Sequence, residues 1–362
     1  MRRRSRLTSA ADEPAVRIGE AVIRPQGAPV YVIAEAGVNH NGDVRAAMRM
    51  VDVAREAGAN AVKFQAFRAA ALVTAQAAAA RYQQDRANAR TQLDLLRSLE
   101  LPPEAFAAIA RHCRSLGIEF LATPFAPDDL RMLVELGVRA VKIASPDITN
   151  VPLLTAAAET GLPMIVSTGA AEPHEIDAMA NLLERHGARE RLVLLHCVSS
   201  YPARETDANL LRIRTLADRY GCPAGFSDHT NSVEIGAIAA AAGAAVIEKH
   251  FTLDPAQPGP DQSFSLDPAA LTAYVSGIRR AETALGRAEL CLLDIEREVR
   301  RLSRCSVVAA RPIAAGEPIS RDMLTVKRPG TGIPPADLDR VAGRVARVDI
   351  PADTLVQWEM LR

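Results

Sequence analysis

VYVIAEA (residues 30–36) is a short apolar run, and the polar cluster GVNHNGD (37–43) and the helical pattern VRAAMRMVDVAREAGA (44–59) follow it. An apolar strand followed by an amphipathic helix and a closing glycine is the repeating unit of a parallel β/α sheet. The turn between strand and helix, GVNHNG, is not the G-x-G-x-x-G of a dinucleotide-binding fold. These residues therefore favour a closed barrel over an open, doubly wound sheet.

The same unit recurs along the chain, to a total of eight between about residue 30 and residue 286. The seven further strands are expected in AVKFQAF, IEFLATPF, AVKIAS, PMIVSTG, RLVLLHCVSS, PAGFSDHT and AVIEKHF. Eight units over ~250 residues predict an α/β protein with a (β/α)₈ TIM barrel. The insert at about 68–100 is longer than an ordinary strand-to-helix loop, and long loops at this end of a barrel usually cover the active site.

The character of the chain changes after residue 286. LCLLDIEREVRRLSR looks like a connecting helix, and beyond it Pro and Gly break the chain into short runs, which predicts a small, mostly β module. The expected organisation is a disordered N-terminus (1–16), a barrel domain (17–286), a linker helix (287–303) and a small domain (304–362). A module of this size buries little core alone, so we expect it to dock on another surface.

The formal charges of the chain balance, with 43 Lys and Arg residues against 43 Asp and Glu. This balance gives no reason to expect nucleic acid or a membrane as a partner. The five cysteines show no C-x-x-C spacing, so neither a disulfide framework nor a thiolate zinc site is indicated. The basic N-terminus has no apolar stretch behind it, and no run approaches the ~20 apolar residues of a spanning helix. We therefore expect a soluble, cytoplasmic protein.

Polar side chains stand at the carboxyl end of every expected strand, where the active site of a barrel lies. They are Glu35, Asn39, His40, Lys63, Gln65, Thr123, Lys142, Ser145, Asp147, Ser167, Thr168, His196, Ser199, Tyr201, Ser227, Asp228, His229, Glu248 and His250. Lysines and hydroxyls converging on one mouth suit a phosphate or a carboxylate. Two imidazoles from neighbouring strands suit a borderline divalent ion such as Mn²⁺, Zn²⁺ or Fe²⁺.

Structural roles compete with these interpretations. A lone histidine such as His196 is expected to be a hydrogen-bonded core residue. The residues alone leave His229 and His250 open between a metal site and core histidines. Lys63 and Lys142 follow apolar residues, so each needs an anionic partner, which is either a structural carboxylate or a ligand. Glu35 is open in the same way, as a catalytic group or as a bridge to a lysine.

Eight motifs of the barrel region together resemble the sialic acid synthases, the nonulosonate synthases. They are VIAEAGVNHNGD, AVKFQAF, FLATPF, VKIASPDI, IVSTGAA, HCVSSYPA, GFSDHT and EKHFTLDPAQPGPDQSFSLDP. The tail, with VKRPGTGIPP, resembles the antifreeze-like (SAF) domain of the same enzymes, and the resemblance runs from about residue 17 to residue 360. It implies condensation of phosphoenolpyruvate with an N-acetylated mannose-type sugar and water, which yields a nonulosonic acid and phosphate.

The resemblance also implies roles for individual residues. His229 and His250 fall on metal ligands for a divalent ion, expected to be Mn²⁺ with Mg²⁺ or Co²⁺ as alternatives, and Glu35, Lys63 and Lys142 fall on catalytic positions. The substrate-binding positions that it implies are Asn39, Gln65, Thr123, Ser145, Asp147, Ser167, Ser199, Tyr201, Ser227, Glu248, Asp261 and Arg328. Arg328 falls on the arginine that one subunit sends into its partner's barrel, which implies a domain-swapped homodimer.

The acceptor sugar is less well defined than the reaction. N-acetylneuraminate synthase is the expected activity, and a legionaminic acid-type synthase acting on a 2,4-diacetamido-trideoxy hexose is the alternative. Ser199 stands where some family members have Asn, and Asp147 stands where some have Glu, so the sugar specificity is in question and the reaction is not. Another phosphoenolpyruvate- or pyruvate-dependent synthase or aldolase, and a glycan- or ice-binding tail on an inert barrel, are weaker alternatives.

Overall fold

The computed structural model describes residues 15–25, 28–74 and 91–362. The expected disorder of residues 1–16 falls almost wholly outside these ranges, as does the middle of the 68–100 insert. The chain divides into two compact units, Met1–Gly286 and Arg287–Arg362. Each unit is described by itself below.

Eight parallel strands form the sheet at the centre of the first unit, in the order β5-β4-β3-β10-β9-β8-β7-β6. The strands are β3 (Tyr31–Gly37), β4 (Ala61–Ala66), β5 (Glu119–Pro124), β6 (Val141–Ile143), β7 (Met164–Ser167), β8 (Leu192–Cys197), β9 (Ala224–Asp228) and β10 (Val246–His250). The first and last strands of the order, β5 and β6, are in contact, so the sheet is a nearly closed barrel. The predicted (β/α)₈ barrel is confirmed.

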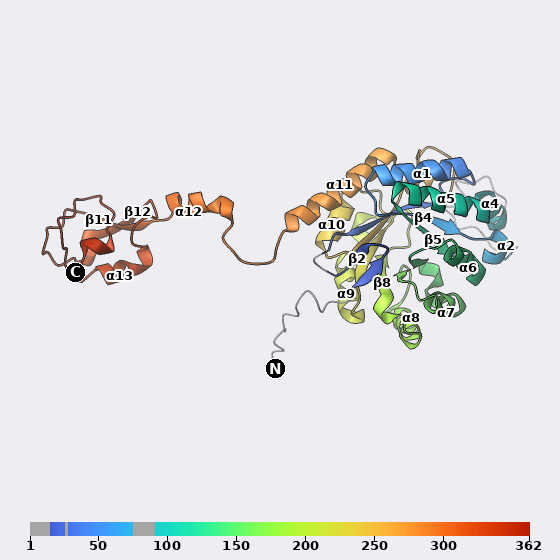
Figure 1. Ribbon diagram of the computed structural model, residues 1–362, viewed down its shortest axis with the longest axis horizontal. Helices are drawn as coiled ribbons and strands as arrows, with labels where there is room; N and C mark the ends of the chain where they lie inside the picture. The colour runs from blue at the N-terminus through green and yellow to red at the C-terminus, as the bar shows by residue number, and fades with distance from the viewer. Residues whose placement is uncertain (1–14, 26–27, 75–90) are drawn as a thin grey trace. The chain divides into compact units, whose positions relative to one another are not determined.

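A ring of helices surrounds these strands (Figure 1). The helices are α1 (Val44–Glu56), α5 (Pro103–Leu116), α6 (Pro127–Glu135), α7 (Val151–Glu159), α8 (Pro173–Arg185), α9 (Leu211–Tyr220), α10 (Ile235–Ala241) and α11 (Pro268–Leu285). Five of them begin with proline at their first or second position after a preceding cap, where the missing N–H costs nothing. Their buried faces pack against the outward side chains of the strands and form the largest apolar core.

A short hairpin lies at the opposite end of the barrel from the strand-end polar residues. Its strands, β1 (Val16–Ile18) and β2 (Ala21–Ile23), are antiparallel, and their buried Val16, Ile18 and Ile23 pack in one cluster with inward-facing strand residues such as Tyr31 and Leu121. The hairpin therefore fills the amino-terminal end of the barrel, and the carboxyl end is left for the polar side chains.

The described parts of the 68–100 insert contain two helices, α2 (Ala69–Leu72) and α4 (Gln92–Leu99). Leu95 and Leu99 of α4 join Val38 and Phe67 in a small buried cluster beside the carboxyl ends of β3 and β4. These residues lie at the rim of the barrel mouth, and the stretch 75–90 falls outside the described residues.

The second unit has its own apolar core and a small antiparallel sheet of β11 (Ser306–Ala309) and β12 (Leu324–Lys327). Isolated bridges such as Val308↔Leu355 and Ile313↔Ile350 extend this pairing, and the short helix α13 (Leu338–Val341) packs into the same core. The predicted small domain with β pairing is confirmed.

The connecting helix is shorter than predicted. The sequence pattern indicates a helix over 287–303, whereas the structure has a 3₁₀ turn at Asp294–Glu296 followed by α12 (Arg297–Ser303). Residues 287–303 are exposed. A short helix without a packing partner gains too little to offset the cost of nucleation, which explains why the first part is not helical.

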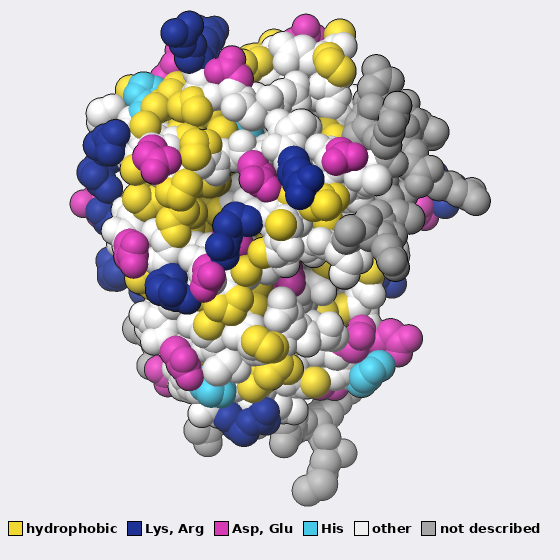
Figure 2. Space-filling model, turned by 90° about the vertical axis from the view of Figure 1, so that its right-hand side faces the viewer, with side chains coloured by type: hydrophobic (Ala, Val, Ile, Leu, Met, Phe, Trp, Pro, Cys, Tyr) yellow, Lys and Arg dark blue, Asp and Glu magenta, His cyan; other side chains and the backbone are white. Residues whose placement is uncertain are grey.

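The barrel face in Figure 2 carries Lys and Arg side chains interspersed with Asp and Glu, with apolar patches between them. This mixture agrees with the equal numbers of acidic and basic residues in the chain. Among the described helices, none combines the length and the hydropathy that a membrane crossing requires.

Candidate active site

The strand ends enclose a small cavity at the carboxyl end of the barrel. Predicted site residues from every strand line it: Glu35, Lys63, Gln65, Thr123, Lys142, Ser145, Ser167, Tyr201, Ser227, His229, Glu248 and His250. The structure therefore brings together side chains that are up to 215 residues apart in the sequence, as the strand-end rule for barrels predicts. Phe125, Ala144, Pro146 and Cys197 complete the lining.

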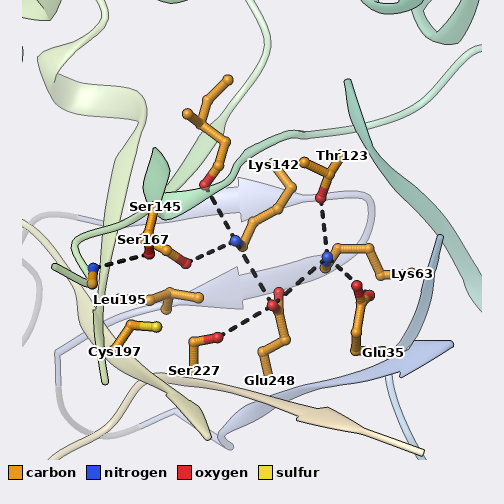
Figure 3. A network of polar contacts seen from close by, with 12 residues as sticks. Glu35, Lys63, Thr123, Lys142, Ser145, Ser167, Leu195, Cys197, Ser227 and Glu248 are labelled. Carbon is orange, nitrogen blue, oxygen red and sulfur yellow. Dashed lines mark hydrogen bonds and ion pairs between the residues drawn. The ribbon is translucent and has the colours of Figure 1, made fainter. Parts of the chain in front are cut away.

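A chain of alternating charges crosses the floor of this cavity (Figure 3). Lys63 Nζ lies 2.8 Å from Glu35 Oε2 and 3.7 Å from Glu248 Oε1, and Lys142 Nζ lies 3.7 Å from the same Glu248 oxygen. Lys63 also donates a hydrogen bond to Thr123 Oγ1 at 3.0 Å, and Ser227 Oγ donates to Glu248 Oε1 at 3.3 Å. Both lysines thus have carboxylate neighbours within the protein, and their predicted role in binding a ligand stays a prediction.

Burial and the neighbouring charges give the carboxyl groups of Glu35 and Glu248 different pKa values. Burial raises the pKa of Glu35 to about 7, although Lys63 works against the shift. Burial acts in the same sense on Glu248, but Lys142 and Lys63 outweigh it and lower the pKa of Glu248 below its usual value. Two carboxyl groups with separated pKa values are the usual sign of different roles, here a group that exchanges protons near neutral pH and one that stays ionised.

The two lysines differ in the same way. Burial lowers the pKa of Lys142 despite its contact with Glu248. At Lys63 burial also acts to lower the pKa, but Glu248 and Glu35 together outweigh it and raise the pKa. Lys63 therefore remains a cation throughout the physiological range, with two carboxylates around it.

Hydroxyl groups and a glycine surround Lys142. Its Nζ donates to Ser167 Oγ at 2.7 Å, and the backbone N–H of Gly169 donates to Ser145 Oγ at 2.9 Å. A Cβ on Gly169 would clash with Ser199 Oγ and lie 2.9 Å from both Ser145 Oγ and Cys197 Sγ, so a larger residue would force these side chains to move. An ammonium, hydroxyls and close backbone form a site that suits a phosphate or a carboxylate.

His229 and His250 lie on neighbouring strand ends with their ring centroids 5.5 Å apart. His229 Nδ1 is 2.8 Å from the carbonyl oxygen of Val198, which can only accept, so Nδ1 carries a proton and faces away from any ion bound at Nε2. This is the arrangement of a metal-binding histidine with an outer partner. Burial acts to lower the pKa of His229, but Cys197 and the Val198 carbonyl outweigh it and raise the pKa, so a metal ion at Nε2 would compete with a proton. The ring of Tyr201 packs over His229, with the centroids 4.3 Å apart.

His250 has an orphaned ring nitrogen. Its buried Nδ1 has no hydrogen-bond partner and lies 3.9 Å from Asp261 Oδ2. Burial and the neighbouring cations lower the pKa of His250 well below its usual value, which keeps the imidazole neutral as a metal ligand requires. Within the described residues no group of three or more His, Cys, Asp or Glu side chains could hold a metal ion. A metal ion held here would therefore have the two imidazoles as ligands, with its other positions open to water or substrate.

Asn39 does not line the cavity, although the resemblance assigns it to substrate binding. Its buried side chain donates from Nδ2 to the carbonyl of Phe251 at 2.8 Å and to Ser265 Oγ at 2.9 Å. Gln262 Nε2 in turn donates to the carbonyl of Asn39 at 3.0 Å. Asn39 thus ties the loop after β3 to the loop after β10, both of which form the mouth.

Four other predicted residues lie outside the cavity lining. Ser199 is exposed, and its hydroxyl lies close to Gly169 at the edge of the site. Asp147 Oδ1 accepts a hydrogen bond from Asn150 Nδ2 at 2.9 Å, and Asp261 lies beside His250 as described above. Arg328 is exposed in the second unit, so its predicted role in a partner's barrel stays a prediction.

Sequence reasoning correctly predicted His196 as structural, and it missed Cys197. His196 is buried, and its Nε2 lies 2.7 Å from the carbonyl of Ala208. Cys197 Sγ faces the cavity 3.7 Å from His229 Nδ1. The alternation of side chains along a strand carries the signal that was missed, because a residue next to an outward-facing histidine must face inward.

Comparisons with known proteins show the family of this chain. The NeuB family model matches residues 50–290, and the SAF domain model matches residues 304–362. The N,N'-diacetyllegionaminic acid synthase of Legionella pneumophila is 41% identical over 343 residues, which cover 93% of this chain and 96% of that protein. The N-acetylneuraminate-9-phosphate synthase of Mus musculus is 33% identical over 333 residues, which cover 91% of this chain and 92% of that protein.

A solved structure gives the same result. The crystal structure of N-acetylneuraminic acid (sialic acid) synthetase from Leptospira borgpetersenii serovar Hardjo-bovis in complex with citrate is 38% identical, with a TM-score of 0.69. The match covers 79% of this chain and 95% of that one. Since both family models match and these relatives are covered almost in full, the chain belongs to the NeuB family of nonulosonic acid synthases and is a phosphoenolpyruvate-dependent sugar acid synthase.

Proposed function

We propose that this enzyme condenses phosphoenolpyruvate with a 2,4-diacetamido-trideoxy hexose and water, and releases phosphate and a legionaminic acid-type product. The observation that carries the reaction is the charge chain Glu35–Lys63–Glu248–Lys142 beside two metal-competent imidazoles. The acceptor is supported by the relatives named N,N'-diacetyllegionaminic acid synthase, which are 41% and 38% identical. N-acetylmannosamine, the acceptor of an N-acetylneuraminate synthase, is the second candidate, supported by the 38% identical synthetase structure.

The phosphoenolpyruvate anions are proposed to bind at Lys142, Ser145 and Ser167. Both lysine contacts with Glu248 are 3.7 Å long, beyond hydrogen-bonding distance, so neither lysine uses an ammonium proton on Glu248. Each ammonium has two shorter contacts, Lys63 with Glu35 and Thr123 and Lys142 with Ser167 and the Ile143 carbonyl, so one proton of each is left for a ligand. Glu248 keeps the lysines charged and oriented before the substrate arrives. Lys63 and Lys142 then stabilise the charge of the departing phosphate through charge-assisted hydrogen bonds.

His229 and His250 would hold a divalent ion, proposed to be Mn²⁺ with Mg²⁺ or Co²⁺ as alternatives, which when bound supplies Lewis-acid polarisation of the acceptor aldehyde. Tyr201 packs on His229 and, with Phe125, gives the mouth an apolar wall. Such a wall suits the methyl group of a deoxy sugar better than a hydroxymethyl group. These residues therefore orient the sugar with its aldehyde carbon facing phosphoenolpyruvate.

The bond forms between C3 of phosphoenolpyruvate and the aldehyde carbon, and the aldehyde oxygen becomes a hydroxyl group with the proton that Glu35 takes from the attacking water. The second proton of that water leaves with the phosphate as HPO₄²⁻. Water adds to C2, and we assign the removal of its proton to Glu35, because a carboxylate with a pKa of about 7 is a general base near its working pH. The tetrahedral centre then breaks its C–O bond to phosphate, which leaves the 2-keto acid. Carbon, oxygen and phosphorus balance with one water consumed and one phosphate released.

Phosphate release from phosphoenolpyruvate tests this proposal. The purified enzyme is incubated with Mn²⁺ and, separately, 2,4-diacetamido-trideoxymannose, N-acetylmannosamine and its 6-phosphate, each with and without chelator, and the product is identified by mass. Release with the diacetamido sugar that stops in chelator and returns with Mn²⁺ is the expected result. Release with N-acetylmannosamine alone would move the assignment to N-acetylneuraminate, and undiminished turnover in excess chelator would reject the metal site.

We also propose that the enzyme works as a domain-swapped homodimer in which Arg328 serves the partner's barrel. The support is the match of residues 304–362 to the SAF domain and the exposure of Arg328. Light scattering on the full chain measures the oligomeric state directly. A fully active monomer would reject this arrangement.

A further inference from the structure

A second set of charged side chains lies behind the candidate metal ligands, on the outer face of the barrel wall. Asp228 and Lys249 are register partners on β9 and β10, and each directly precedes a candidate ligand, His229 or His250. Both are completely buried. Because side chains alternate along a strand, these two point away from the mouth and toward the helices.

Tyr274 of α11 completes this set, and we refer to Asp228, Lys249 and Tyr274 as the outer triad. Lys249 Nζ lies 2.8 Å from Asp228 Oδ2, and Tyr274 Oη donates to the same oxygen at 2.9 Å. The ammonium is also 5.2 Å from the centroid of the tyrosine ring. Gly236 of α10 makes room for this ring, since a Cβ there would lie 2.5 Å from Tyr274 Cζ.

The outer triad holds the backbone of the residue after His229. Asp228 Oδ1 accepts the N–H of Thr230 at 2.8 Å, and Lys249 Nζ donates to the carbonyl of Thr230 at 2.6 Å. Lys249 directly precedes His250 on β10. Its hydrogen bond to Thr230 therefore fixes the chain just after His229 to the strand that carries His250. The two backbone segments that carry the imidazoles are therefore joined by a buried ionic contact as well as by the sheet.

We propose that the outer triad is a positioning device that sets the separation of His229 and His250 for metal binding. Stability alone is a weak reason for such a pair, because well-packed apolar side chains often stabilise a core as well as a buried ion pair does. What a buried ion pair adds is a fixed geometry. This inference rests on the proposed function, since it assumes that the two imidazoles hold a divalent ion.

The test measures binding of Mn²⁺ alone, by the electron paramagnetic resonance of the free ion, to full-length protein freed of metal and without substrates. Tyr274→Phe keeps the ring against Gly236 and removes only the hydroxyl, and Lys249→Met removes the charge. Loss of an outer partner weakens metal binding by about 10- to 100-fold, so we expect a Kd increase of about tenfold for Tyr274→Phe and more for Lys249→Met. Tyr31→Phe is the matched control, because it removes a buried hydroxyl without a partner at the opposite end of the barrel.

Circular dichroism and melting in chelator show whether each variant folds, and Tyr274→Phe decides the question if Lys249→Met does not. Folded variants with the Kd of the unaltered protein would overturn the positioning role and leave the proposed function intact. Equal Mn²⁺ binding by the unaltered protein and by His229→Ala would instead overturn the metal site, and the positioning role with it. A weakened Kd for Tyr274→Phe beside an unchanged Kd for Tyr31→Phe is the supporting result.

Discussion

Glu35 should make the activity of this enzyme strongly dependent on pH between 6 and 8. With a pKa of about 7, the carboxylate fraction is about one-tenth at pH 6 and about nine-tenths at pH 8. A general base works only when ionised, so kcat/KM should rise about tenfold across this interval. A carboxyl group with an ordinary pKa is almost fully ionised at both ends and would give a nearly flat profile.

The assay follows phosphate release at saturating Mn²⁺ from pH 5.5 to 9, because metal binding by histidine is itself dependent on pH. Glu35→Gln should lower kcat/KM by about 10²- to 10⁴-fold and remove the acid limb of the profile. Lys63 lowers the pKa of Glu35, so weakening that contact should move the limb to higher pH. A flat profile in the unaltered enzyme, an acid limb that persists in Glu35→Gln, or a decline above pH 7 in place of the rise would refute the assignment of Glu35 as the base.

Three further substitutions test other parts of the structure. Gly169→Ala places a Cβ 2.9 Å from Ser145 Oγ and Cys197 Sγ, so the KM for phosphoenolpyruvate should rise at least about tenfold. The free energy of unfolding should fall by about 1–3 kcal/mol. An unchanged KM would contradict the close packing of Gly169 against these side chains. Asn39→Ala removes two buried hydrogen bonds between the loops after β3 and β10. The free energy of unfolding in urea should fall by about 1–3 kcal/mol, with a smaller change in kcat. Full stability with lost activity would favour direct substrate binding by Asn39 instead. Arg328→Ala should lower kcat/KM while the melting temperature stays unchanged, because the side chain is exposed; full activity would show that this arginine serves no active site.

Local patterns in the sequence were enough to predict the barrel and its mouth. Apolar strands such as 30–36 and amphipathic helices closed by glycine repeat with the spacing of β/α units, and each repeat is legible without reference to the others. The same rule then places Glu35, Lys63 and His229 at one end of the barrel, because every strand of a parallel barrel ends there. For this reason most of the cavity lining was predictable from residues alone.

The pairing within that mouth was not legible from the sequence. Glu248 contacts both Lys63 and Lys142, and Asn39 donates a hydrogen bond to Ser265. The residues next to each of these in the sequence do not indicate which partner it contacts. The exposed start of the linker, which is helical in pattern and not in structure, shows the same limit. Secondary structure follows from neighbours three or four positions away, whereas these contacts exist only once the barrel brings distant strands side by side.

The pKa values and the orientations of the site residues depend most of all on the closure of the barrel. Glu35 has a pKa near 7 because the folded barrel removes water from around it, and this effect outweighs the opposing effect of Lys63, whose Nζ lies 2.8 Å from Glu35 Oε2. Asp228 and Lys249 face each other only because β9 and β10 pair in one register, and a shift of either strand by one residue would turn its own charged side chain into the mouth. Residue types and spacing therefore define which groups reach the site, while desolvation and cross-strand register, which arise from packing, define what those groups can do.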